Sequence, residues 1–465
     1  ANTVYVALDN HKYGDYKPYL LKSTDRGRTW RSIVGNIPDR HLMWRIVQDH
    51  KNPNLLFTAT EFGIYFSLDG GAKWVKMTGK APTISFRDLT IQRREDDLVA
   101  ASFGRGFFIV DDISPLRELS EASLDTEAML FPGRKAWWYI EQHPLAFDAG
   151  GSQGHGYYRA PNPPFGANFT YYLADDIKSL KEQREEREKP ASKAGTDTPF
   201  PGFDAITAEL QETAPMIWLT VRDADGNVVR RIKGAAKKGF HRVNWDLRYP
   251  ATDVARPVGP SGEEPAGFLV SPGQYTVSMS KRVRGVTTQL VAAKPFTVEP
   301  LRAGAMPQQG DAHEFWAEIA AFDRSVTALA STLGEVEKKI GLLKIAAERA
   351  PGGDPAALDN RWQSIRTEAN ALDALLNGNK ARNVLSERTQ RTVRSRLGVI
   401  MTGLFGSTYG PTQTHREQLG YAKADFTAIR DRMDTLVTST IPAFEAELLA
   451  AGAPYVPGGR LPQAQ

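Results

Sequence analysis

The sequence contains no cysteine, so disulfide bridges, thiolate metal sites and cysteine nucleophiles are all excluded. It has no run of about eighteen apolar residues, so we expect no membrane-spanning segment. Its 58 basic and 54 acidic residues leave a net charge of only +4, which does not indicate a nucleic-acid-binding surface. Its eight histidines show no H-x-x-x-H spacing, so we expect neither a metal ion nor another cofactor.

The chain also lacks an initiator methionine and a signal peptide, because it opens at Ala1 with the strand-like run TVYVAL. We therefore expect it to be a piece of a longer protein. It has 465 residues, of which 41% are hydrophobic and 24% are charged. This is enough core-forming material for about three globular domains.

An octet occurs twice near the start of the chain, as STDRGRTW at Ser23–Trp30 and as SLDGGAKW at Ser67–Trp74. The two copies are 44 residues apart, which is a typical period for one blade of a β-propeller. Strand-like runs around the second copy, HLMWRIVQDH, NLLFTAT, GIYFSLD and WVKM, predict a four-stranded antiparallel sheet. The run DLVAASFGRGFFIVDD aligns with NLLFTATEFGIYFSLD at an offset of 43. We expect about three blades over residues 1–118.

We interpret the octet as a device that locks a turn, not as a catalytic element. Its aspartate can accept backbone N–H bonds, its glycine can adopt a positive φ, and its tryptophan can pack across the hairpin. The residues with this structural role are Ser23, Asp25, Gly27, Trp30, Ser67, Asp69, Gly71 and Trp74. Three blades do not close a ring, so we expect the remaining blades to lie N-terminal to Ala1 or on another chain.

An aromatic residue beside an arginine occurs in the first strand of two repeats. These pairs are Trp44-Arg45 and Phe86-Arg87, aligned at a spacing of 42 residues. Together with Arg105 and Glu61, they form our candidate set for binding an anionic or peptidic ligand. The other interpretation is structural: the arginines pair with nearby acids and hold the blades together. The acids available for this are Glu61, Asp88 and Asp111.

Residues 119–300 have a different β pattern, with strands at the spacing of an immunoglobulin-like β-sandwich. Asp225-Gly226 marks a hairpin turn within PMIWLTVRDADGNVVRRIKG, and Trp245 is the expected core anchor. The segment at about 175–212 interrupts this pattern with alternating charges and almost no apolar stripe. We expect an exposed helical arm there, either a docking element or a solvated decoration.

Residues 301–465 change to the spacing of helices, and we expect an antiparallel helical bundle. Apolar residues advance in steps of four and three over Phe315–Leu343, and similar stripes occupy Leu358–Leu376, Val393–Leu404 and Phe426–Leu436. The stretch Lys380–Ile400 holds six basic residues and one acidic residue. It either faces an anionic surface or forms a solvated face of the bundle, and its interleaving with an apolar stripe favours the solvated face.

The two octets, or Asp-boxes, together with ASFGRGFFIVDDISPLREL, NPPFGANFTYYL, GFHRVNWDLRYP and GAPYVPGGRLP, resemble the C-terminal part of large secreted bacterial proteins. This is the sortilin-type, BNR-repeat propeller family, whose members are often named glycosyl hydrolases. The resemblance implies a secreted, periplasmic or cell-surface location and a propeller completed by N-terminal blades. Sortilin receptors have a cysteine-rich module after the propeller, whereas this chain has no cysteine.

Two functions remain open from the sequence. The first is a non-catalytic binding or scaffold protein that holds a peptide, protein or glycan in the propeller channel. The alternative is a sialidase-like glycoside hydrolase whose catalytic residues lie mostly in blades outside this chain. Glycoside hydrolysis needs two carboxylates across a cleft, and no such pair is identifiable here. We therefore favour the binding protein.

Overall fold

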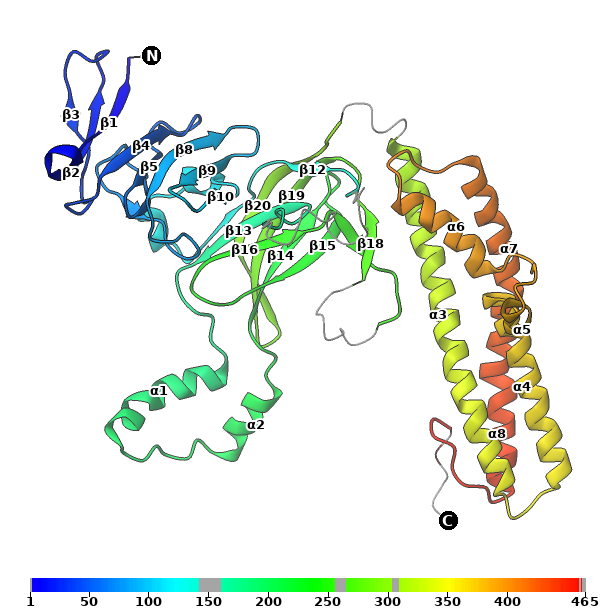
Figure 1. The fold of residues 1–465 in the computed structure, drawn as a ribbon. Coiled ribbons are helices and arrows are strands. Elements are labelled where there is room, and N and C mark those ends of the chain that lie inside the picture. Colours follow the sequence, from blue (N-terminus) through cyan, green and yellow to red (C-terminus); the bar gives the residue numbers. More distant parts are fainter. Residues whose placement is uncertain (1, 142–159, 256–264, 303–308, 460, 462–465) are drawn as a thin grey trace. The chain divides into compact units, whose positions relative to one another are not determined.

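The chain contains a sheet-rich N-terminal part followed by a helical C-terminal region, as Figure 1 shows. The computed structural model describes residues 2–141, 160–255, 265–302, 309–459 and 461. Its contacts divide the chain into two units. The first contains Ala1–Trp138, Ala149–Leu247 and Pro272–Glu299, and the second contains Arg248–Ser271 and Pro300–Gln465. The repeats and the following β segment therefore belong to one unit, and the domain boundary near residue 118 within that unit stays a prediction.

Three small antiparallel sheets follow one another in chain order in the first unit. The middle sheet has the four predicted strands in the order β4-β5-β6-β7, and each of its neighbours has three. The strands of the three sheets are β1 (Val4–Asn10), β2 (Asp15–Ser23) and β3 (Arg31–Ser32); β4 (Met43–Gln48), β5 (Leu56–Thr60), β6 (Gly63–Ser67) and β7 (Val75–Lys76); and β8 (Phe86–Gln92), β9 (Asp97–Ser102) and β10 (Phe107–Val110).

Each pair of neighbouring sheets encloses a hydrophobic core. Leu20 and Ile33 of the first sheet pack with Leu56, Tyr65 and Trp74 of the second. A second core includes the buried residues Leu55, Phe57, Ala59, Ile64, Phe86, Leu89, Leu98, Ala100 and Ile113. The middle sheet is buried on both faces, because successive residues of a strand point to opposite sides. Leu56 of β5 belongs to the core with the first sheet, whereas Phe57 and Ala59 belong to the core with the third.

Both octets form the turn between the last two strands of their sheet. The hydroxyl of Ser67 donates to Asp69 at 2.7 Å and accepts from the amide of Gly71 at 2.9 Å. Asp69 also accepts from the amide of Lys73 at 3.0 Å, and Gly71 has a φ of +99°. The first copy repeats this pattern, with Gly27 at a φ of +85°. These contacts agree with the interpretation of the octet as a turn lock.

The remaining strands of the first unit form two further sheets, which curl into a half-barrel in Figure 1. Their orders are β11-β13-β16 and β12-β20-β19-β14-β15. The strands are β11 (Ala128–Phe131), β12 (Ala136–Trp138), β13 (Ala167–Leu173), β14 (Met216–Arg222), β15 (Val228–Gly234), β16 (Gly239–Trp245), β19 (Gly273–Val283) and β20 (Val286–Pro300).

Aromatic contacts join these two sheets. Phe169 of β13 contacts Phe296 of β20 with ring centroids 5.1 Å apart. Trp245 of β16 contacts Tyr275 of β19 at 5.6 Å, and it is only 1% exposed. Trp245 is therefore a core residue, as the sequence predicted, since large aromatic side chains provide much of the area buried between packed sheets.

A helical arm lies between β13 and β14 and projects from the sheets in Figure 1. It consists of α1 (Leu180–Ala194) and α2 (Phe203–Gln211), neither of which has a buried residue. Ser179 begins α1 through a capping box with Glu182, which satisfies amide groups that the first turn of a helix leaves free. The prediction of an exposed charged helix in this segment agrees with the structure.

The second unit contains the hairpin β17 (Arg248–Pro250) and β18 (Ala266–Leu269) together with the C-terminal helices. These helices are α3 (Gln309–Glu348), α4 (Pro355–Asn377), α5 (Lys380–Val384), α6 (Val393–Phe405), α7 (Gln413–Thr435), a π-helical turn η4 (Leu436–Thr440) and α8 (Ile441–Ala450). The apolar residues that define the four predicted stripes are buried, including Phe315, Trp362, Leu397 and Phe426.

Candidate binding hollow around Trp44 and Arg87

A surface hollow of about 520 Å³ lies where the three small sheets meet. We call it the Trp44 hollow. It is lined by His11, Tyr16, Arg40, Leu42, Trp44, Glu61, Phe62 and Arg87. These residues come from the 3-10 turn η1 (His11–Tyr13) and β2, from the loop before β4, from β4 and the turn after β5, and from β8. Three of the six predicted ligand-binding residues, Trp44, Glu61 and Arg87, therefore line one hollow.

A bulge in each first strand places Trp44 and Arg87 in this hollow. In β4, Met43 pairs with Thr60 and Arg45 pairs with Ala59, so Trp44 has no opposing residue. In β8, the pairing skips Arg87 in the same way. A bulge changes the direction of the extra side chain and is common beside functional sites.

The bulges correct the alignment that the sequence suggested. Trp44 corresponds to Arg87, at a spacing of 43 residues instead of 42. Phe86 instead corresponds to Met43, and both are buried, with exposures of 0% and 1%. Phe86 is therefore a core residue that contacts Phe108 at a centroid distance of 5.4 Å, and it does not line the hollow. The sequence missed this because a bulge leaves no pattern in the residue types.

Arg87 contacts two aromatic rings. Its Cζ lies 3.7 Å from the ring centroid of Trp44 and 5.0 Å from that of Phe103. A guanidinium group at such distances is attracted by the negative face of the ring. The stacking restricts the orientation of the Arg87 side chain.

Glu61 is tied into the wall of the hollow by hydrogen bonds to one of its oxygens. Its Oε2 accepts from the indole N–H of Trp44 at 3.0 Å and from the hydroxyl of Ser85 at 2.9 Å. The same oxygen lies 3.7 Å from a guanidinium nitrogen of Arg87. Among the described residues that line the hollow, Glu61 is the one carboxylate. Its position suits it to hold Trp44 and Arg87 in place.

Several lining residues were not in the predicted set. Arg40 lies over the ring of Tyr16 at 5.8 Å, and Phe62 contacts His41 at a centroid distance of 5.0 Å. Tyr16 and Phe62 are 46% and 42% exposed. They come from turns and strand ends, where sequence periodicity carries no information about direction. Composition alone could have indicated these residues in the sequence, because exposed aromatic side chains that cluster beside arginines are typical of binding surfaces.

The other predicted residues lie elsewhere on the first unit. Arg45 pairs with Asp88 through a contact of 3.2 Å between Nε and Oδ1, which joins β4 to β8. Both side chains are more than half exposed, and such a pair contributes little to stability. Arg105 is exposed in the turn between β9 and β10. Arg45 therefore forms an ion pair with a neighbouring acid, as the structural interpretation of the arginines predicted. Arg87 lies in the hollow and also beside Glu61.

No protein-family model and no curated protein matches this chain. Among solved structures, it is similar to PorZ, a bacterial surface component of the type IX secretion system of Porphyromonas gingivalis, at 13% identity and a TM-score of 0.19. That alignment covers 64% of this chain and 29% of PorZ. It is also similar to the extracellular domain of a putative one-component system from B. thetaiotaomicron, at 12% identity and a TM-score of 0.17, with coverage of 63% and 31%.

A third similar structure is an ancestral GH74 enzyme, at 13% identity and a TM-score of 0.20. The alignment covers 62% of this chain and 41% of the enzyme. This chain thus corresponds to less than half the length of each of these three proteins. Their activities are not transferred to it by similarities of this size.

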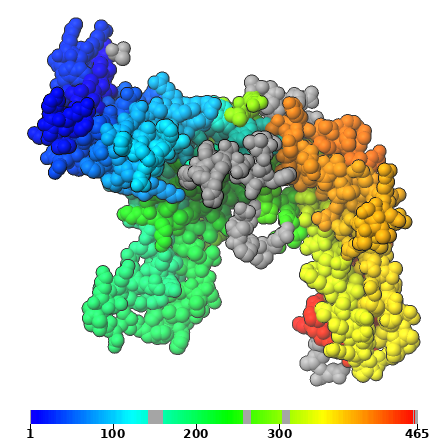
Figure 2. All heavy atoms as spheres, in the orientation of Figure 1, coloured from blue at the N-terminus to red at the C-terminus, as the bar shows by residue number. Residues whose placement is uncertain are grey.

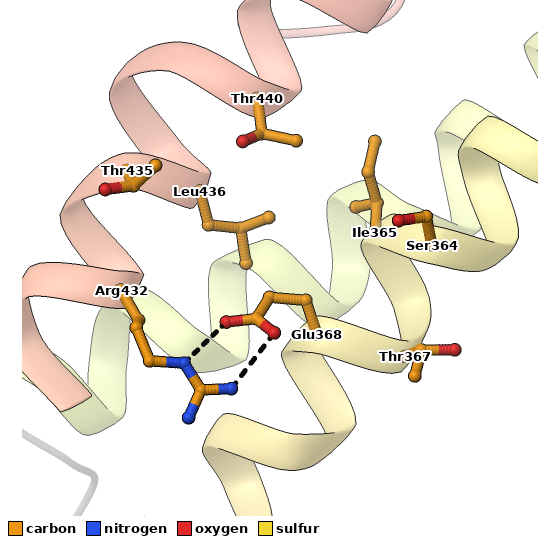
Figure 3. A pocket seen from close by; sticks show the side chains of 8 residues that line it. All are labelled: Ser364, Ile365, Thr367, Glu368, Arg432, Thr435, Leu436 and Thr440. Atoms are coloured by element: carbon orange, nitrogen blue, oxygen red, sulfur yellow. Dashed lines mark hydrogen bonds and ion pairs between the residues drawn. The ribbon is translucent and has the colours of Figure 1, made fainter. Parts of the chain in front are cut away.

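A second hollow, of about 500 Å³, lies in the helical unit and is shown in Figure 3. Its lining includes Glu368 of α4 and Arg432 of α7, which form two hydrogen bonds of 2.8 and 3.0 Å. Thr440, at the end of the π-helical turn, also lines it. Pro442 follows this turn and has no N–H to continue an α-helical ladder. Because the two charges neutralise each other, we interpret this hollow as a gap where helices meet and not as a ligand site.

Among the described residues, no group of three or more His, Asp or Glu side chains is arranged to hold a metal ion. None of the described helices combines the length and the apolar character needed to cross a membrane.

Proposed function

We propose that this chain is part of a non-catalytic binding or scaffold protein of the bacterial cell surface or extracellular space. Its ligand is an anionic segment of a peptide, protein or glycan that enters the Trp44 hollow. The observation that carries this proposal is the pairing of Arg40 with the exposed ring of Tyr16, and of Arg87 with the partly buried ring of Trp44, around a hollow of about 520 Å³. Arginine binds carboxylates through paired N–H groups, and aromatic faces bind sugar rings or apolar side chains.

We further propose that the three small sheets are consecutive blades of a β-propeller with Asp-box turns. The order β4-β5-β6-β7, with the octet between its last two strands, has the form of one blade. A propeller needs at least about four blades, so its closure requires blades outside this chain, on the same parent protein or on a partner. The Trp44 hollow would then lie beside the central channel, where first strands are exposed.

Binding is better supported than glycoside hydrolysis. Hydrolysis needs an acid and a second carboxylate roughly 5 to 10 Å apart. Of the described lining residues, only Glu61 carries a carboxylate, and its Oε2 already accepts two hydrogen bonds. An enzyme would need its second carboxylate from another part of the parent protein.

A binding experiment tests this function. The purified chain is applied to arrays of acidic and neutral peptides and glycans, and the affinity for the strongest ligand is measured by calorimetry. We expect preference for acidic ligands and a loss of about tenfold or more in affinity for Arg87→Gln, the size expected for a residue at the centre of a binding site. The matched control is Arg93→Gln, because Arg93 is exposed and does not line the hollow.

Three results would contradict the proposal. Equal affinity for neutral and acidic ligands would show that the arginines do not select an anionic ligand. An equal effect of the two arginine variants would place the ligand elsewhere. Turnover of an aryl glycoside or sialoside by the native chain, lost in Arg87→Gln, would show an active site instead of a binding site.

A further inference from the structure

A second surface lies in the helical unit, well separated in sequence from the Trp44 hollow. We call residues 379–394 the basic segment. Every residue from 379 to 391 is exposed. The segment contains one acidic residue, Glu387, and five basic residues, Lys380, Arg382, Arg388, Arg391 and Arg394. Figure 2 shows this part of the chain, between yellow and orange, on the surface of the helical unit.

The structure changes the interpretation of this segment that the sequence suggested. A solvated bundle face was favoured because the charges were interleaved with a buried apolar stripe. That stripe begins only at Val393, in α6, which is fully buried. Before it, Val384 and Leu385 are 84% and 71% exposed. The first part of the segment therefore presents its apolar side chains to solvent, together with its charges.

A tight turn holds the two apolar side chains outward. Helix α5 ends at Val384, and the amide of Leu385 donates to the carbonyl of Arg382 at 3.1 Å. Ser386 then adopts a φ of +55°, a left-handed conformation that ends the helix. The amide of Glu387 also donates to the carbonyl of Arg382, at 3.0 Å. The backbone bonds that close this turn leave the side chains of Val384 and Leu385 free to contact another surface.

Most of the positive charge of the segment is not neutralised. Lys380 pairs with Asp373 at 2.8 Å, and Arg382 has only a long contact of 3.9 Å with Glu387. Arg394 donates to the neutral side chain of Asn377, which leaves its charge in place. For Arg388 and Arg391, the described residues provide no ion pair. Three arginines thus keep their charge close to the exposed Val384-Leu385 pair.

We propose that the basic segment attaches the protein to an anionic phospholipid membrane. Exposed apolar side chains insert at the boundary between headgroups and acyl chains, and neighbouring arginines are attracted to anionic headgroups. A soluble acidic polymer would use the arginines but would gain little from Val384 and Leu385. The combination therefore favours a membrane surface, to which the protein attaches peripherally. This inference does not depend on the function proposed for the Trp44 hollow.

Vesicle sedimentation tests the proposal with the full chain. Vesicles contain either phosphatidylcholine alone or a mixture with phosphatidylglycerol. We expect binding only to the anionic vesicles, weakened by salt because the attraction between exposed charges is screened. We expect Arg388→Glu/Arg391→Glu and Val384→Ser/Leu385→Ser each to lower the partition coefficient by about tenfold or more. All these side chains are exposed, so the variants are expected to fold, which circular dichroism verifies.

The control is Arg349→Glu/Arg361→Glu, which makes the same change in net charge at two exposed arginines elsewhere on α3, α4 and their connection. It is expected to alter the partition coefficient by less than about twofold, since attraction falls off within a Debye length. An equal loss in this control would overturn the proposal in favour of general charge attraction. A normal partition coefficient for Val384→Ser/Leu385→Ser would overturn it in favour of a soluble acidic partner, and absence of binding to anionic vesicles would also overturn it.

Discussion

At the scale of single residues, Arg117 joins two buried aspartates that follow the first strands of different sheets. Asp49 and Asp96 are each only 3% exposed. The guanidinium of Arg117 donates to both oxygens of Asp49 and to both oxygens of Asp96 at 2.7 to 2.8 Å. Burial acts to raise the pKa of Asp96, but hydrogen bonds from Arg117 and Lys51 outweigh it and lower that pKa from 3.8 to about 2. The pKa of Asp49 is also lowered, because the effect of burial is outweighed by its hydrogen bonds, including those from Arg117.

We predict that Arg117→Met destabilises the first unit by about 3–5 kcal/mol, because it leaves two buried carboxylates without their partner. The lowered pKa of Asp96 means that its stabilising contribution is complete above pH 3.8 and is lost as the pH falls toward 2. Without Arg117, burial raises both pKa values. The two carboxylates then cost stability while they are charged, so the destabilisation by Arg117→Met should shrink as the pH falls and they become protonated. Urea unfolding at several pH values measures this.

The control combines Arg117→Met with Asp49→Asn and Asp96→Asn. Removing the carboxylates should restore much of the lost stability and abolish the difference in acid sensitivity. If Arg117→Met alone unfolds at the same denaturant concentration as the native chain at all pH values, the cluster does not stabilise the sheets.

At the scale of elements, the two octet turns share the hydrogen bonds of their serine and aspartate to the backbone but have different surroundings. Trp74 is 2% exposed and donates from its indole to the carbonyl of Ile33 at 2.8 Å. Its counterpart Trp30 is 43% exposed and donates within its own turn, to the carbonyl of Gly27 at 3.0 Å. The octet therefore defines the turn locally, while a neighbouring sheet determines whether its tryptophan becomes a core residue.

This difference predicts unequal costs for the same substitution in the two turns. A Cβ on Gly71 would lie 3.0 Å from the Cβ of Ile33, whereas a Cβ on Gly27 would meet only the Trp30 ring at 3.4 Å. Both glycines have positive φ, so alanine costs about 1–3 kcal/mol of backbone strain at either. We expect Gly71→Ala to cost about 1 kcal/mol more than Gly27→Ala, because overpacking adds to the strain.

Chemical denaturation of the two alanine variants, compared with the native chain, measures the difference in the free energy of unfolding. Equal values would mean that the contact with Ile33 relaxes without cost. A larger loss for Gly27→Ala would contradict the packing argument.

At the scale of the whole molecule, the chain divides into two units whose cores are formed by different elements. Trp245 lies between the sheets of the first unit. Trp362 lies in the second, where it is 6% exposed and donates to the carbonyl of Ile340 at 3.0 Å. The hairpin of β17 and β18 belongs to the second unit, and Phe268 of β18 stacks on Phe405 of α6 at 5.2 Å.

We predict two thermal unfolding transitions in calorimetry, because separate cores unfold as separate cooperative units. Trp245→Ala should lower the transition temperature of the first unit alone, and Trp362→Ala that of the second unit alone. Each substitution should reduce the free energy of unfolding of its unit by about 3–5 kcal/mol. A single transition that both variants shift equally would show that the two units unfold together.

The helical part of the fold was predictable in detail from the sequence. Steps of four and three residues identify the buried face of α3 from Phe315 to Leu343, because 3.6 residues per turn return a side chain to the same face. The octet turns, the hairpin at Asp225-Gly226 and the core position of Trp245 were also predictable. In each case a local pattern is sufficient, since the relevant contacts lie within a few residues or follow a regular period.

The candidate site was predictable only in part. The residue types at Trp44, Glu61 and Arg87 indicated it, but the sequence placed Phe86 in the site and omitted Tyr16, Arg40 and Phe62. Only tertiary structure decides these points. A β-bulge moves one side chain to a different face without altering the apolar pattern, and a hollow formed by three sheets depends on how their surfaces pack.

The sequence by itself determined the repeats, the turn chemistry, the helical stripes and the absence of cysteine chemistry, because these depend on residue identity and short-range periodicity. Tertiary structure alone decided which arginine stacks on Trp44, which octet tryptophan is buried, and that Val384 and Leu385 face solvent. These outcomes depend on contacts between segments far apart in the chain, and the energy of such contacts is set by shape and solvent exclusion, which no local pattern records.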